Sequence, residues 1–192
     1  MKLIKENLDG DHVALELIAE QHREALRPMV NEHSIWEYAI LSGYGDNFDK
    51  WFDDAKLNND NGRDFTYIVR EKATNNLVGS TRFTNIDTDH KRLEVGYTWY
   101  NPQVWGGLVN PSCKYLMFSH AFDHMGANRV ELKANNDNSR SLAAMKKAGA
   151  VFEGVLRHHM VNPDGVTLRD SAIFSLTKDD WPQAKAGLLA RL

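Results

Sequence analysis

The stretch RLEVGYTWYNPQVWGGLVNPSCK, residues 92–114, places a strand pattern directly before a turn with two glycines and a helix pattern. Apolar side chains alternate with polar ones through Arg92–Tyr100, as is typical of a β-strand. Gly106 and Gly107 follow, and from Val109 onward the apolar residues recur at the three- and four-residue spacing of a helix. A helix N-terminus offers unpaired N–H groups and a partial positive charge, and glycines let a ligand approach the backbone. The turn is therefore either an ordinary strand-to-helix connection or a cradle for a phosphate.

The same residues make two predictions about local structure. Alternation along the strand is expected to place Leu93, Val95, Tyr97 and Trp99 on one face and Glu94, Gly96 and Thr98 on the other. Asn110 followed by Pro111 is typical of a helix N-cap and the first helical position.

The hydrophobic pattern on both sides of this stretch predicts a mixed α/β order. Strands are expected at 12–18, 65–72, 77–87, 92–100, 128–135, 151–161 and 167–176, and helices at 19–30, 34–40, 47–59, after the glycine turn, at 139–150 and in the tail from Asp180. This order predicts an α/β protein with a mixed sheet of about seven strands. The crossover from Tyr97 to Lys133 is expected to join two parallel strands in the right-handed sense.

Composition narrows the class of protein. The chain has 192 residues and a net charge of −3, without a long basic run, so nothing indicates binding to nucleic acid. A single cysteine, Cys113, excludes an internal disulfide and fits a reducing compartment. The first ten residues lack a signal-peptide core, and no apolar run approaches the length of a membrane span. We therefore expect a cytoplasmic protein that does not associate with membranes.

The segment EVGYTWYNPQVWGG, followed by a helix and by NRVELKANNDNSRSLAAMKKAGAVFEGVLR, resembles the GNAT superfamily of acetyl-CoA-dependent N-acetyltransferases. Within it, the chain is most similar to ribosomal-protein N-terminal acetyltransferases of the RimJ/RimL type. The similarity extends from Leu77 to Leu176. It implies one GNAT domain over 1–192, with a mixed, mostly antiparallel sheet flanked by helices and splayed between the fourth and fifth strands. It also implies an acyltransferase that moves acetyl from acetyl-CoA directly to a primary amine.

The resemblance assigns a cofactor site. The family's pyrophosphate loop, Gln/Arg-x-x-Gly-x-Gly/Ala, maps onto Gln103, Gly106 and Leu108. The chain departs from the pattern at Leu108, which can still present its N–H if the side chain turns outward, and at Pro111, which has no N–H. The implied cofactor-binding residues are Thr98, Trp99, Gln103, Val104, Trp105, Gly106, Gly107, Leu108, Val109, Asn110, Lys114, Asn138 and Ser141. Lys114 is equally well read as a solvated surface lysine, and Asn138 as a helix N-cap, which is compatible with a second role.

The resemblance also assigns catalytic roles. An amine must lose a proton before it can attack a thioester, and Glu94 is the candidate base, with a carboxylate on the sheet surface as the alternative. The N–H of Thr98 or Trp99 is the candidate donor to the oxyanion. Ser141 is the candidate donor to the leaving thiolate, or an ordinary first-turn serine, because Met145 stands where many members have a tyrosine.

The sequence says least about the residues that bind the amine acceptor. Trp36, Tyr38, Arg157 and His159 are candidate substrate-binding residues, and no His/Cys spacing indicates a metal. Asp46, Asp49, Asp53 and Asp54 either attract a cationic acceptor or form a solvated acidic face. The acceptor is a protein N-terminus or a small amine, and the protein is a monomer or a homodimer. The alternative function is a protein that binds CoA or acetyl-CoA with little or no catalysis.

Overall fold

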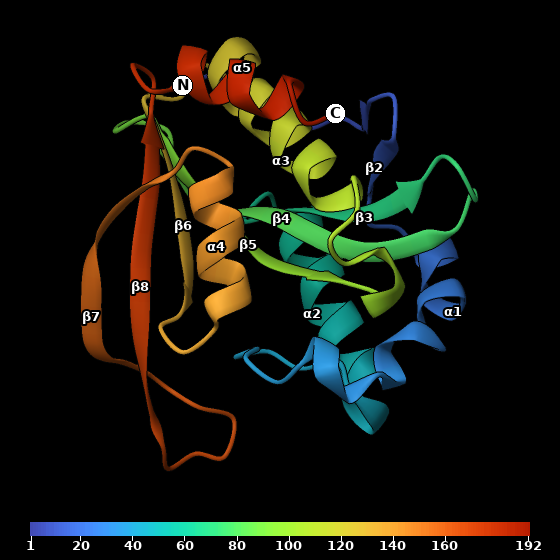
Figure 1. Cartoon of the computed structure of the whole chain (residues 1–192). Coiled ribbons are helices and arrows are strands. Elements are labelled where there is room, and N and C mark those ends of the chain that lie inside the picture. Colours follow the sequence, from blue (N-terminus) through green and yellow to red (C-terminus); the bar gives the residue numbers. More distant parts are fainter.

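The computed structural model describes residues 1–192 and contains one eight-stranded sheet in the order β1-β2-β3-β4-β5-β6-β8-β7 (Figure 1). The strands are β1 (Leu8–Asp9), β2 (Val13–Leu17), β3 (Phe65–Glu71), β4 (Leu77–Asp87), β5 (Arg92–Tyr100), β6 (Arg129–Asn135), β7 (Val151–Val161) and β8 (Leu168–Thr177). The helices are α1 (Arg23–Leu26), α2 (Phe48–Asp60), α3 (Val109–Ser119), α4 (Ser139–Lys147) and α5 (Trp181–Leu189). The predicted mixed sheet is confirmed, and the eighth strand is the two-residue β1.

The sheet divides where its only parallel pair begins to separate. β5 and β6 are parallel and are paired only where Arg92–Glu94 of β5 lie beside Arg129–Glu131 of β6. Every other pair of neighbouring strands is antiparallel. Beyond Glu94 the two strands diverge, as Figure 1 shows, and the last part of β5 has a neighbour only on the β4 side. The splay predicted between the fourth and fifth strands lies at this position. It leaves backbone hydrogen-bonding groups of β5 without a strand partner.

A β-bulge at Tyr97 reverses the two faces of β5. Gly96 pairs with Arg82 and Trp99 with Ser80, so two residues of β5 oppose one residue of β4. Tyr97 has a positive φ of 49°, which is unusual for a residue with a bulky side chain.

The predicted faces of this strand are therefore correct only before the bulge. Leu93 and Val95 belong to the main core, but Trp99 belongs to a second cluster with Trp36 and Trp51. Strict alternation placed Trp99 on the same face as Leu93, and the extra residue at the bulge is the physical reason that it is not.

The two cores lie on opposite sides of the sheet. The larger cluster joins one sheet face to α3 and α5 through residues such as Met117, Phe118 and Trp181. The smaller cluster joins the opposite face to α2 through Phe48, Trp51, Phe52 and Ala55, the helical face that the sequence predicts. Figure 1 shows α3 and α5 on one side of the sheet and α1 and α2 on the other. None of the helices combines the length and the apolar character that a bilayer crossing requires.

The segment between β2 and α2 is less regular than predicted. Instead of one helix over 19–30, the structure has the short α1 between two 3₁₀ turns, and 34–40 contains only a 3₁₀ turn at His33–Ile35. Trp36 donates its indole N–H to the Val30 carbonyl at 2.8 Å and packs 5.3 Å from the Trp99 ring, measured between ring centroids. Tertiary contacts of this kind hold the segment, which is too short for a stable helix on propensity alone.

The first turn of α3 begins earlier than the sequence predicts. Leu108 is the N-cap residue, and its carbonyl accepts the Ser112 N–H at 3.0 Å, so Asn110 is the second helical residue and the predicted Asn110 cap is wrong. Pro111 is then the third helical residue, where a backbone N–H would have no partner within the helix. In contrast, Asn138 caps α4 as predicted by accepting the Ser141 N–H at 3.0 Å.

Candidate active site

A cavity of about 480 Å³ occupies the split in the sheet. It is bounded by the end of β5, the glycine turn, α4, the facing part of β8 and the irregular segment 35–41. The residues assigned from sequence that line it are Trp36, Tyr38, Glu94, Thr98, Trp99, Val104, Trp105, Gly106, Gly107, Asn110, Lys114, Asn138 and Ser141. Gln103, Leu108, Val109, Arg157 and His159 do not line it.

Backbone amides without partners gather where the glycine turn enters α3. The N–H groups of Gly106, Leu108, Val109 and Asn110 donate no hydrogen bond within the chain, whereas Gly107 donates to the Val104 carbonyl. Gly106 has a φ of +76°, and a Cβ added there would meet nothing within 4 Å. Free N–H groups at a helix N-terminus with open space beside a glycine form a site for an anion.

Leu108 leaves this cradle open even though it replaces a small residue. Its side chain is 43% exposed and does not line the cavity, so its amide can face a ligand while the side chain points to solvent.

Lys114 supplies positive charge one turn into α3. The residue is only 7% exposed, lines the cavity and belongs to no ion pair, so it is not the solvated lysine of the alternative interpretation. Burial lowers the pKa of its amine from 10.5 to about 8. A buried ammonium without a carboxylate partner is costly unless an anion approaches it.

The end of β5 offers a strand edge to the cavity. The Asn101 N–H donates to the Val78 carbonyl at 2.8 Å on β4, and the backbone direction alternates along a strand. Trp99, two residues earlier, therefore directs its N–H and C=O toward β4, while Thr98 directs them toward the open side. The side chain of Thr98 is held by Thr81, with 2.7 Å between their Oγ1 atoms. The two candidate oxyanion donors thus differ in orientation, and Thr98 has the free N–H.

Across the cavity, α4 contributes polar groups from its first turn. Asn138 and Ser141 line the cavity next to Arg140, whose guanidinium stacks 3.5 Å from the centre of the Trp105 ring. Met145, also on α4, is 3% exposed and belongs to the main core. Its thioether carries no proton to donate.

Glu94 is buried, and its carboxylate is held on one side. Glu94 Oε2 accepts from Asn85 Nδ2 at 2.7 Å and lies 2.9 Å from Lys133 Nζ. Burial opposes the charge of Lys133, but the hydrogen bond and charges of Glu94 and Glu131 raise its pKa overall, so the lysine stays protonated. Because Oε2 accepts both bonds, Oε1 remains free for a proton from the cavity.

Several residues that line the cavity or hold its side chains have no distinctive sequence signal. Lys133 on β6 and Arg169 and Ser171 on β8 sit in ordinary strand patterns, and Asn85 ends the alternation of β4. These side chains meet at the cavity only because β6 pairs with β8 and because β6 diverges from β5. Arg157, by contrast, is exposed on β7, and His159 is half-buried outside the cavity.

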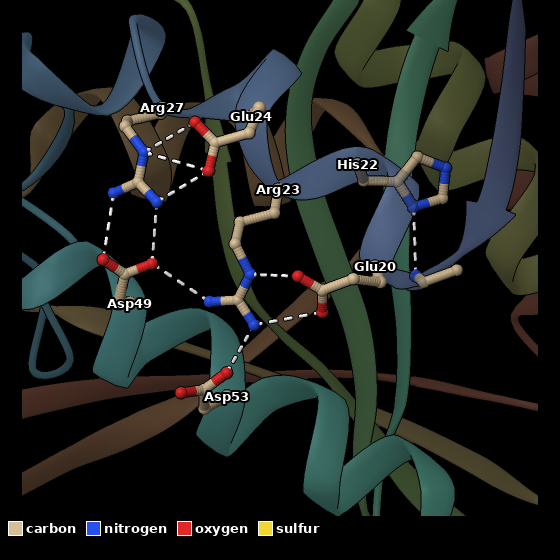
Figure 2. Close-up of polar contacts among 8 residues, drawn as sticks. Glu20, His22, Arg23, Glu24, Arg27, Asp49 and Asp53 are labelled. Atoms are coloured by element: carbon tan, nitrogen blue, oxygen red, sulfur yellow. Dashed lines mark hydrogen bonds and ion pairs between the residues drawn. The ribbon is translucent and has the colours of Figure 1, made fainter.

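Two arginines, Arg23 and Arg27, pair with Asp49 and Asp53 of α2 and also with Glu20 and Glu24 of their own segment, as Figure 2 shows. Asp49 lies 3.0 Å from Arg23 and 2.8 Å from Arg27, and Asp53 lies 2.5 Å from Arg23. The two guanidinium groups also stack on the rings of Phe52 and Phe48 at 4.3 and 4.8 Å. Asp49 and Asp53 therefore join α2 to α1, within a cluster of four carboxylates and two guanidinium groups that keeps a net negative charge.

The sequence of the chain is similar to those of known proteins. A family model described as "Acetyltransferase (GNAT) domain" matches residues 12–151. YdaF of Bacillus subtilis (strain 168), provisionally named a ribosomal N-acetyltransferase, is 29% identical over 114 residues, covering 57% of this chain and 58% of YdaF. The matched stretches span only 58 to 64% of the lengths of the curated relatives.

Solved structures match over nearly the whole chain. A provisionally named acetyltransferase from T. thermophilus is 30% identical, with a TM-score of 0.87 and complete coverage of both chains. RimJ of Mycobacterium smegmatis, solved in complex with CoA-disulfide, is 17% identical with a TM-score of 0.82, covering 97% of this chain and 94% of RimJ. At that identity the likeness to RimJ concerns the fold alone.

Proposed function

The chain belongs to the acetyltransferase (GNAT) domain family, and from this premise we propose that it is an N-acetyltransferase. It transfers the acetyl group of acetyl-CoA directly to a primary amine, which is a protein N-terminus or a small molecule. The reaction takes place in the cavity between β5 and β6, within one domain over 1–192 in the cytoplasm.

The observation that carries this proposal is the set of free amides beside a buried, unpaired lysine. The N–H groups of Gly106, Leu108, Val109 and Asn110 and the ammonium of Lys114 fit the pyrophosphate of acetyl-CoA. The strand edge of β5 fits the amide groups of the pantetheine arm, because an extended chain can pair there as an added strand. Asn138 and Ser141 on α4 face this arm from the other side.

The residues near the junction of β5 and β6 fit direct transfer. Acetyl-CoA supplies the activated acyl group. The acceptor ammonium first loses one proton, so that the neutral amine attacks the thioester, and the nitrogen of the tetrahedral intermediate then loses a second proton to water. Glu94 accepts the first proton through Oε1, directly or by way of water. The N–H of Thr98 points to the open side of β5 and donates to the oxygen that becomes negative. Ser141 donates its proton to the departing sulfur and regains one through water from the nitrogen of the intermediate, since Met145 has no proton to give.

A CoA-binding protein with little catalysis is the second candidate, and one observation favours it. The carboxylate of the candidate base Glu94 is engaged by Lys133, and Met145 offers no hydroxyl as a second donor to the thiolate. The two candidates share the cofactor site and differ only in product formation.

Cofactor binding is tested first. Gly106→Glu places a carboxylate into the space beside the free amides, so we expect loss of acetyl-CoA binding in calorimetry while the far-ultraviolet circular dichroism spectrum is retained. The control is Gly165→Glu, since Gly165 also has a positive φ and open space but lies in the β7–β8 turn. Retained affinity in Gly106→Glu would move the phosphate site elsewhere.

Catalysis is tested by Glu94→Gln, which keeps the shape of the side chain and removes its basicity. We expect the rate of amine acetylation at pH 7 to fall about 100-fold, within the usual contribution of a general base, and to recover partly as pH rises and more acceptor becomes neutral. An unchanged rate and pH profile would remove Glu94 as the base. Turnover by neither the wild type nor this variant, with acetyl-CoA bound, would favour the binding protein.

A further inference from the structure

The acceptor side of the cavity contains buried hydrogen-bond donors that the chain itself leaves unused. Arg169 is 9% exposed and lines the cavity, and its Nε has no partner. Its only hydrogen bond runs from Nη1 to the Tyr38 carbonyl at 3.2 Å, and it takes part in no ion pair. Ser171, which is fully buried and also lines the cavity, has a hydroxyl without a partner. Leaving such groups without a partner is costly, which suggests that a ligand completes them.

Strand pairing places these donors on the same sheet face as Glu94. Glu94 is paired with Glu131, and alternation along β6 puts Lys133 and Asn135 on that face. Asn135 is paired with Ser171 on β8, and Arg169 follows at the next position of the same face. The candidate base and the two unused donors therefore face one space from either side of the split.

The other buried cations on this face are in ion pairs, whereas Arg169 is not. Lys133 is paired with Glu94 and Glu131, and Arg82 with Asp64 at 3.3 Å. Arg169 remains as the buried cation without an ion pair, although the charge of Glu94 opposes the lowering of its pKa by burial. A guanidinium matches the two oxygens of a carboxylate. An acceptor with an amine toward Glu94 and a carboxylate toward Arg169 would complement both groups.

We propose that the amine acceptor carries a carboxylate and that Arg169, aided by Ser171, binds it. This inference rests on the proposed acetyltransferase function and narrows its substrate class. The carboxylate comes either from a free amino acid or from an acidic side chain near the N-terminus of a peptide, and Arg169 selects for it without taking part in proton transfer.

The test compares acceptors with and without this charge, with kcat/KM expressed per neutral amine, because the carboxylate also raises the pKa of the neighbouring amine. L-Phenylalanine is compared with L-phenylalaninamide, and the dipeptide amide Ser-Asp with Ser-Asn, using wild-type protein, Arg169→Met, Ser171→Ala and the control Arg63→Met. Arg63 is an exposed arginine outside the cavity.

We expect the wild type to prefer the acid in at least one pair. Arg169→Met should lower kcat/KM for that acid by about 10- to 100-fold through KM, as expected for a lost charged hydrogen bond, and leave its amide within about twofold. Ser171→Ala should show a smaller loss confined to the acid, and Arg63→Met no change.

Two results overturn the inference. The first is that the wild type prefers the acid in neither pair. The second is that Arg169→Met lowers kcat/KM equally for acid and amide, which would indicate a structural role of Arg169 through its contact with Tyr38. The pair that discriminates identifies the source of the carboxylate. If the wild type binds acetyl-CoA but acetylates no amine, the proposed function fails. Calorimetry of the same acids and amides with CoA-bound protein then decides the inference, because tighter binding of an acid supports it and equal or absent binding overturns it.

Discussion

Lys114 should make the protein both less stable and better at binding its cofactor, and replacing it with methionine separates the two effects. Its amine is buried without a carboxylate, and burial lowers its pKa from 10.5 to about 8. That difference corresponds to about 3 kcal/mol, the free energy by which the folded state disfavours the charged form. Methionine keeps most of the apolar stem and removes the charge.

The sign of the effect follows from proton binding. Below about pH 8 the lysine is protonated in both the folded and the unfolded state, so the full cost is present. Between pH 8 and 10.5 the unfolded state holds the proton and the folded state does not, so the wild type gains stability as pH rises. We therefore expect Lys114→Met to unfold at higher urea than the wild type at pH 7, by up to about 3 kcal/mol, and this advantage to shrink toward pH 10.5.

Cofactor binding should respond in the opposite direction. An anion beside Lys114 stabilises its ammonium, so binding of CoA above pH 8 should take up a proton, and its calorimetric enthalpy should depend on the ionisation enthalpy of the buffer. Lys114→Met should bind CoA at least about tenfold more weakly at pH 7, in line with a lost charged contact, and lose the proton uptake. Lys50→Met, at an exposed lysine paired with Asp54, is the control. Equal affinity for CoA in Lys114→Met, or a less stable variant at pH 7, would refute the reasoning.

Two further predictions concern packing around the cavity. Burial raises the pKa of the Cys113 thiol to about 12, so we expect Cys113 to react with an aromatic disulfide reagent at pH 8 only as fast as the protein unfolds; reaction at the rate of free cysteine would contradict its burial. Gly79→Ala would bring a Cβ within 2.2 Å of the Trp99 carbonyl, so we expect a loss of about 1 to 3 kcal/mol in urea denaturation. In the control Gly187→Ala, where a helical glycine has no neighbour within 4 Å, stability should rise slightly, and similar values for both variants would argue against a close β4–β5 contact at Gly79.

Patterns with a short range in the sequence predicted most of the fold. The alternation predicted strands at 65–72, 77–87 and 92–100, and the structure has them there, with β3 ending one residue earlier at Glu71. The helical spacing of Phe48, Trp51, Phe52 and Ala55 and the glycine that ends α4 also correspond to elements at the expected places. Gly149 adopts the positive φ of 87° that favours glycine after a helix. Such features depend on side chains a few residues apart, so the local sequence carries them.

Positions that depend on a distant partner were predicted less well. The segment 34–40 looks helical, yet Trp36 is held by Val30 and Trp99 in an irregular conformation. Asn110 looks like a cap, but α3 begins at Val109 because the preceding turn brings Leu108 into the cap position. The acidic start of α2 fits either a surface that attracts a cation or a solvated face, and its contact with Arg23 and Arg27 makes it a joint between helices (Figure 2).

The sequence by itself determined the order of β2 to β8 and of α2 to α5, the turn with Gly106 and Gly107, and the family resemblance, because each is a matter of residue type and spacing along the chain. The tertiary structure alone decided how these parts make a site. The bulge at Tyr97 turned Trp99 to the opposite face, and the divergence of β5 from β6 opened the cavity. The pairing of β6 with β8 then brought Arg169 and Ser171 to the face of Glu94. Register and divergence depend on contacts between segments that are far apart in the chain, so no local pattern could reveal them.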